Sequence, residues 1–217
     1  EYRSNPERSA VHVYAVDFTG CSWRAVWRFE NVRHVHGVYF DPYADAFWVT
    51  TGDTDTEAAI WRSDDHFQTL RRVAGGSQQL RAVQLLFTPD YVYFGSDTPE
   101  EYNNIYRMDR SGSTVESLVS VGGSIFYGCQ VDRSLFFSTA VEPSKVNPCT
   151  FSEVWRSDDG TNWQKSLEFK KDRLPMKYFQ YGQVLFPLGD GNQKSLYCTP
   201  FATEFHEKTF VFPQAEA

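Results

Sequence analysis

One pentapeptide occurs twice in this chain, and its spacing constrains the architecture. Residues 61–65 read Trp-Arg-Ser-Asp-Asp, and residues 155–159 repeat them unchanged, 94 residues later. A weaker copy lies about halfway, at residues 105–109, so the repeat period is about 47 residues. The aromatic residues that anchor successive copies are Tyr14, Trp61, Tyr106, Trp155 and Tyr197. A period in the forties is typical of β-propellers and of helical solenoids.

Local patterning decides between these two architectures. Each repeat unit contains short runs of β-branched and aromatic residues separated by Gly, Asp, Pro and Ser, and no amphipathic helix of useful length is visible. Such runs are typical of strands. We therefore predict an all-β protein, a β-propeller built from four-stranded antiparallel blades.

The repeat boundaries predict one domain over residues 1–217. They indicate a half blade at 1–30 and full blades at about 31–76, 77–123, 124–172 and 173–217, which makes about 4.5 blades. The half blade leads us to expect that the chain lacks its N-terminal strands. Two alternatives stay open: a partner completes the ring, or five blades close with one incomplete. An incomplete ring exposes sheet edges and would favour a homo-oligomer.

Composition excludes several classes of protein. The 18 Phe, 12 Tyr and 6 Trp exclude a disordered chain. No run of about 18 apolar residues exists, so no membrane span is expected. The 21 basic residues are outnumbered by 28 acidic ones, for a net charge of −7, and this balance disfavours nucleic acid as a partner. The 4 cysteines form no C-x-x-C pair and are predicted to be buried free thiols.

The outer hairpins carry a recognisable motif. Residues 157–163 read Ser-Asp-Asp-Gly-Thr-Asn-Trp, and residues 63–70 read Ser-Asp-Asp-His-Phe-Gln-Thr-Leu. The first matches S-x-D-x-G-x-T-W with one residue deleted. The second keeps the spacing with Phe for Gly and Leu for Trp. Residues 17–23 and 109–114 hold a stretched and a degenerate copy. The pattern resembles the Asp-box (BNR) repeat of the sialidase-like superfamily over about residues 11–170.

The resemblance implies a propeller and a bias towards glycans. It implies a structural role for the boxes, which lie away from the catalytic face in that superfamily. A sialidase needs three arginines around a carboxylate, but only Arg81 lies near the mouth of an inner strand. Sialidase activity is therefore not carried over to this chain.

A candidate site follows from the blade register. The strand next to the innermost one ends in an acid at Asp53, Asp97, Glu142 and Asp190, in phase with the repeat. Polar and aromatic side chains gather at the starts of the innermost strands. We predict that this rim binds a ligand through Arg81, Gln84, Asp97, Tyr127, Lys177 and Tyr181. The alternative is that each acid only ends its strand by capping a turn.

Two histidines form the sharpest single feature. Strand alternation places His34 and His36 on the same side of their strand. Together with Asp53 and Glu142 they are the predicted catalytic residues. No cofactor is predicted, although a divalent metal on the two imidazoles is kept as a minor alternative. A third interpretation is that the histidines only hold the adjacent loop.

These features favour recognition of carbohydrate at the central face of a propeller. One hypothesis is a carbohydrate-active enzyme, either a glycoside hydrolase or a polysaccharide lyase. The alternatives are a non-catalytic glycan-binding propeller and a scaffold for protein–protein interaction. Mutation of His36 would separate the first two, because only an enzyme has turnover to lose.

Overall fold

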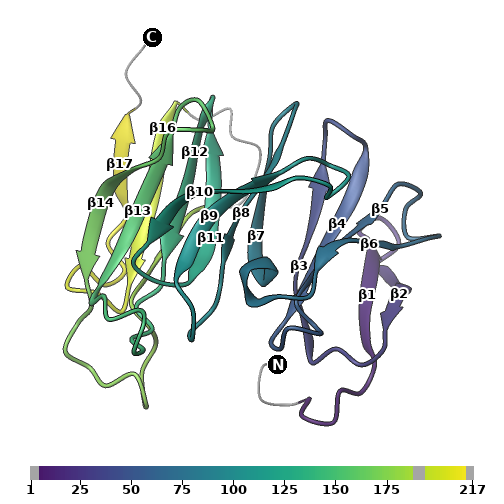
Figure 1. Ribbon diagram of the computed structural model, residues 1–217, viewed down its shortest axis with the longest axis horizontal. Coiled ribbons are helices and arrows are strands. Elements are labelled where there is room, and N and C mark those ends of the chain that lie inside the picture. The colour runs from purple at the N-terminus through teal and green to yellow at the C-terminus, as the bar shows by residue number, and fades with distance from the viewer. Residues whose placement is uncertain (1–4, 188–193, 214–217) are drawn as a thin grey trace.

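The computed structural model describes residues 5–187 and 194–213. Within these ranges the chain forms seventeen strands in five antiparallel sheets, together with one short 3-10 helix, η1 (Gln78–Leu80). The sheets stand side by side in a row, from β1–β2 at one end to β15–β17 at the other (Figure 1). No helix of the described chain has the length and apolarity needed to cross a membrane.

The sheets follow one another along the chain, and we call them the first to the fifth blade. The first blade contains β1 (Val11–Asp17) and β2 (Ser22–Phe29). The second contains β3 (His34–Asp41), β4 (Ala46–Gly52), β5 (Ala59–Ser63) and β6 (Arg71–Gly75). The third contains β7 (Ala82–Phe87), β8 (Val92–Ser96), β9 (Asn103–Met108) and β10 (Val115–Val121). The fourth contains β11 (Ile125–Val131), β12 (Ser134–Thr139), β13 (Phe151–Ser157) and β14 (Gln164–Lys170). The fifth contains β15 (Gln183–Leu185), β16 (Ser195–Phe201) and β17 (Phe210–Pro213).

The apolar runs are buried because each blade packs against the next. Strands β8 and β12 are buried along their whole length, whereas β10 exposes most of its residues. Trp48 and Ile60 of the second blade share a core with Phe94 of the third. Ile105 of the third blade packs with Phe137 of the fourth. Each such side chain stabilises the fold by about 1.5–3 kcal/mol when it leaves water.

The observed strands agree with the predicted units except in the fifth blade. The aromatic and polar composition of Lys177–Gly182 predicts the innermost strand of this blade, and this prediction is wrong. The segment turns instead, with the amides of Tyr178 and Phe179 donating to the carbonyl of Pro175. Only Gly182 pairs, in an isolated bridge with Val141. The described part of this blade therefore has three strands.

The outer hairpins are held by aspartate side chains. Asp65 accepts hydrogen bonds from the Thr69 amide at 2.8 Å and from the Ser63 hydroxyl at 2.9 Å. Asp159 accepts from the Asn162 amide at 2.7 Å. The carboxylates are stabilised in their charged form, so these hydrogen bonds lower the pKa of both aspartates. These aspartates therefore fix the geometry of both turns through local hydrogen bonds.

The cysteines differ in part from their prediction. All 4 are free thiols, and Cys198 is buried. Cys21, however, is exposed, because it lies in the β1–β2 turn, where its φ of 50° belongs to a turn rather than a strand.

Candidate functional site

Four blades contribute to one cavity of about 580 Å³, which we call the central cavity. Seven of the residues predicted from the sequence line it: His34, His36, Arg81, Asp97, Tyr127, Glu142 and Tyr181. They come from β3, from the segment before β7, from the ends of β8 and β12, from β11 and from the turn before β15. The structure thus gathers most of the predicted rim in one place.

An irregularity near the start of the innermost strand in the second, third and fourth blades shapes the cavity wall. The register shifts between Val35 and Gly37 in β3, which leaves His36 as the extra residue. A matching shift between Ile125 and Tyr127 in β11 isolates Phe126. In β7 the irregularity falls between Ala82 and Leu85. Bulges re-aim side chains and are frequent next to active sites.

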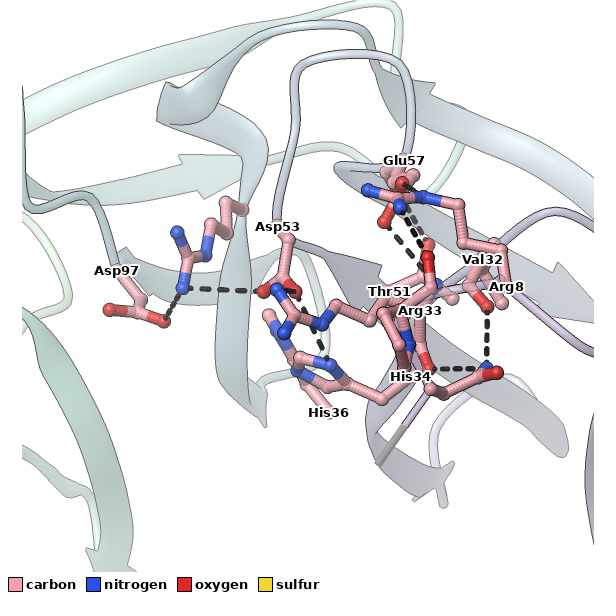
Figure 2. A network of polar contacts seen from close by, with 12 residues as sticks. Arg8, Val32, Arg33, His34, His36, Thr51, Asp53, Glu57 and Asp97 are labelled. Atoms are coloured by element: carbon pink, nitrogen blue, oxygen red, sulfur yellow. Dashed lines mark hydrogen bonds and ion pairs between the residues drawn. The ribbon is translucent and has the colours of Figure 1, made fainter. Parts of the chain in front are cut away.

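Buried charged side chains cluster at the cavity, and two of them, Arg81 and Asp97, line it. Arg81 lies 3.1 Å from Asp97 and 3.6 Å from Asp53, and the three side chains are 9%, 7% and 8% exposed. Asp53 also lies 3.4 Å from Arg33 and 3.6 Å from His34 (Figure 2). Its φ of 148° is unusual for a residue with a side chain. Such strain occurs where the surroundings fix a functional group.

The two histidines are held in their neutral form. The Nδ1 of His36 lies 2.8 Å from the carbonyl oxygen of Ala82, to which it donates. Burial lowers the pKa of His36. The pKa of His34 is lowered mainly by burial and in second place by the charge of the neighbouring His36. The ring centroids lie 4.6 Å apart (Figure 2). His36 therefore keeps its Nε2 lone pair for an acid, a hydrogen-bond donor or a metal.

Glu142 is a carboxyl group suited to proton transfer. Burial, followed by the charge of Asp97, raises the pKa of Glu142, while a hydrogen bond from Tyr181 and the charge of Arg81 act in the opposite direction. The bridge between Val141 and Gly182 ties the Glu142 segment to the turn that carries Tyr181. A carboxyl group with a raised pKa beside another carboxylate is a common acid–base arrangement.

Aromatic rings form a further part of the wall. Phe126 contacts Tyr127 and Tyr181, with ring centroids 6.4 Å apart in both pairs. The sequence-based prediction omitted Phe126, as well as Gln183 and Phe201, which also line the cavity, whereas Gln180 belongs to the polar residues expected at this rim. In a regular strand the side chains of Phe126 and Tyr127 would point to opposite faces of the sheet. The bulge in β11 brings both to the cavity. No pattern in the sequence marks that bulge.

Three of the predicted residues that the structure describes do not line the central cavity. Asp53 lies behind it, in the ion-pair cluster. Gln84 lines a different cavity of about 500 Å³, where its side chain donates to the Leu85 carbonyl at 3.0 Å. Lys177 lies on the turn before β15, with its ammonium 5.3 Å from the Tyr178 ring centroid. Asp190 lies outside the described residues.

Comparisons with known proteins bear on the fold. No protein-family model matches the sequence, and neither does any curated protein. Among solved structures, TolB from Acinetobacter baumannii is similar, with a TM-score of 0.52 and 16% identity over 95% of this chain. The β-propeller domain of the trilobed protease from Pyrococcus furiosus also has a TM-score of 0.52, with 11% identity over 95% of the chain.

The chain has a β-propeller fold. The likeness confirms the predicted all-β architecture of four-stranded blades, with about four to five of them present. The chain spans 49% of the TolB chain and 66% of the trilobed protease domain. At these identities the likeness concerns the fold alone. It gives no support to an Asp-box or sialidase-like assignment, which stays a hypothesis based on the hairpin sequences.

Proposed function

We propose that the chain binds a carbohydrate in the central cavity. The observation that carries this proposal is that aromatic rings and buried polar groups share one cavity wall. Tyr127 and Phe126 offer apolar faces, on which the C–H face of a sugar ring can stack. Glu142, Asp97 and Gln183 offer acceptors and donors for hydroxyl groups.

The charges favour a neutral sugar. Arg81 is the one arginine among the described residues that lines the cavity, but it is already engaged by Asp97 and Asp53. A sugar carboxylate or sulfate would compete with both buried aspartates. Removing a buried carboxylate's partner is strongly unfavourable. A neutral oligosaccharide leaves this ion-pair cluster intact.

A glycoside hydrolase is the second candidate, because of Glu142. Glycosidases use one carboxylic acid that stays protonated and one that stays ionised. Glu142 has a raised pKa and lies close enough to Asp97 to feel its charge. In this candidate Glu142 protonates the leaving oxygen of the glycosidic bond, and His36 Nε2 or Asp97 accepts a proton from water.

Binding is tested by calorimetric titration with a panel of neutral and acidic oligosaccharides. We expect saturable binding of a neutral member, weakened about tenfold in Tyr127→Ala because a stacking face is lost. Tyr14→Ala is the matched control, since Tyr14 is 52% exposed and lies on β1, outside the cavity. Equal affinity in both variants, or no binding of any glycan, contradicts the proposal and favours the scaffold alternative.

Catalysis is tested with Glu142→Gln on a glycan that binds. An enzyme loses turnover in this variant and retains affinity, because Gln keeps the shape and most hydrogen bonds. Product analysis by mass spectrometry gives the readout. Absence of products with the unmodified protein rules out the hydrolase and leaves the binding proposal standing.

A further inference from the structure

Three side chains next to the central cavity point to a metal site. His34, His36 and Asp53 each present a nitrogen or oxygen atom, and these three atoms lie within 4.8 Å of one another. His34 pairs with Gly52 across the β3–β4 ladder, which brings Asp53 beside both imidazoles (Figure 2). We propose that this trio binds a divalent transition-metal ion. The proposal does not depend on the carbohydrate.

His36 already has the arrangement of a metal ligand. Its Nδ1 donates to the Ala82 carbonyl, so the neutral ring carries its lone pair on Nε2. Metal-binding histidines usually donate their other nitrogen to a carbonyl or carboxylate in this way. A Cβ on Gly52 would lie 2.5 Å from His36 Cε1 and 3.1 Å from Nε2. The absence of a side chain at Gly52 therefore leaves room along this edge of the ring.

Asp53 supplies an independent observation. Its side chain is 8% exposed, yet neither carboxylate oxygen has a hydrogen-bond partner in the described structure. Its contacts with Arg33, His34 and Arg81 measure 3.4–3.6 Å, which is longer than a typical hydrogen bond. Asp41, by contrast, is held by Arg110 at 2.7 Å. Buried carboxylates are normally paired and hydrogen-bonded or coordinate metals.

The donor set indicates the class of ion. Two imidazoles and one carboxylate suit Zn²⁺, Fe²⁺, Co²⁺ or Ni²⁺, whereas Mg²⁺ and Ca²⁺ prefer oxygen donors. Ligands about 2.0–2.2 Å from Zn²⁺ lie about 3.4 Å apart in a tetrahedron. The trio would therefore have to close by about 1.5 Å at its widest separation. Three protein ligands leave a further position for water or substrate.

The neighbouring arginines set a limit on affinity. Arg33 and Arg81 both lie near Asp53 and repel a cation. Arg81 has its shorter contact with Asp97, at 3.1 Å, so it keeps a carboxylate partner when Asp53 turns to a metal. Arg33→Gln should therefore tighten metal binding, by about tenfold, because one positive charge near the ion is removed. A merely damaged site cannot gain affinity.

The test is calorimetric titration of EDTA-treated, dialysed protein with Zn²⁺, supported by visible absorption with Co²⁺. We expect one equivalent of either ion and no saturation with Mg²⁺. His36→Gln and Asp53→Asn should each weaken Zn²⁺ binding more than about 100-fold, since even loss of a group that only orients a ligand costs 10–100-fold.

Matched controls lie nearby. Asp55→Asn changes a carboxylate two residues away that accepts from Gln78 at 3.0 Å, and His66→Gln changes an exposed imidazole. Both should bind Zn²⁺ like the unmodified protein. Absence of stoichiometric Zn²⁺ or Co²⁺ binding by the unmodified protein overturns the proposal. Binding that survives both His36→Gln and Asp53→Asn overturns it as well, because the ion then lies elsewhere.

Discussion

At the residue scale, the position of His36 depends on Gly52. An alanine Cβ at Gly52 would lie 2.5 Å from His36 Cε1, so the ring would have to move away from the Ala82 carbonyl. We expect Gly52→Ala to lower the free energy of unfolding by about 1–3 kcal/mol, the usual effect of overpacking. Urea unfolding gives the stability, and the NMR signal of the His36 Nδ1 proton reports its hydrogen bond. An unchanged signal would show that the ring keeps its hydrogen bond to Ala82, and would contradict the expected displacement.

Glu142 should lower stability at neutral pH. Its pKa is raised above the ordinary value of 4.5, so the folded state binds the proton more tightly than the unfolded state. The resulting stabilisation is present below pH 4.5 and is lost as the pH rises through the folded-state pKa. Because Glu142 is partly exposed, Glu142→Gln should raise Tm at pH 7 by only about 1–2 °C. Thermal unfolding at pH 4 and pH 7 tests this, and an equal rise at both pH values contradicts it.

Sequence reasoning located individual cavity residues from their place at the start of an inner strand. His34 and His36 lie at the start of β3, where the bulge at His36 still leaves both lining the cavity, and Arg81 directly precedes β7. Gln84 was misplaced because the irregular register of β7 sends it to the opposite cavity. The contacts of Asp53 with two arginines and with His34 depend on packing between elements, which no local pattern encodes.

At the element scale, the contribution of the outer hairpins to stability should depend on pH and decrease in acid. Hydrogen bonds from Ser111 and from the Thr114 amide, the latter 2.9 Å long, lower the pKa of Asp109 to about 2. The folded-state pKa is depressed, so the stabilisation is present above the ordinary value of 3.8 and is lost as the pH falls towards 2.

Asp109→Asn should therefore lower stability at pH 7 by less than about 1 kcal/mol, because the turn is exposed to solvent. The difference between the variant and the unmodified protein should shrink between pH 4 and pH 2. Urea midpoints at several pH values provide the measurement. A difference that stays constant with pH would assign the effect to geometry instead of charge.

Most strands were predictable because each combines an apolar run with turn residues at both ends. The fifth blade shows where this reasoning fails. Lys177–Gly182 has the composition of a strand, but the amides of Tyr178 and Phe179 are bound by the Pro175 carbonyl and cannot join a ladder. The segment therefore forms a turn despite its strand propensity, because tertiary context often overrides that propensity.

At the scale of the whole molecule, the fold prediction rested on the repeat period. Each period corresponds to one propeller blade, a supersecondary unit that buries its faces against its neighbours. The core clusters each join two consecutive blades, for example Phe136 and Val184. Contacts between blades that use charged side chains were not predictable. They join residues far apart in sequence that share no motif, as Asp41 and Arg110 do.

Arg110 is expected to be a main polar link between the second and third blades. It lies in the β9–β10 turn, 2.7 Å from the buried Asp41 at the end of β3, and it also donates to the Thr88 carbonyl. Arg110→Ala leaves Asp41 buried without its partner, so we expect a loss of about 3 kcal/mol in the free energy of unfolding.

Arg156→Ala is the matched control, because its pair with Asp158 stays within one hairpin and is exposed. It should lose less than about 1 kcal/mol. Chemical unfolding of both variants tests the link, and equal losses would mean that apolar packing alone holds the blades together.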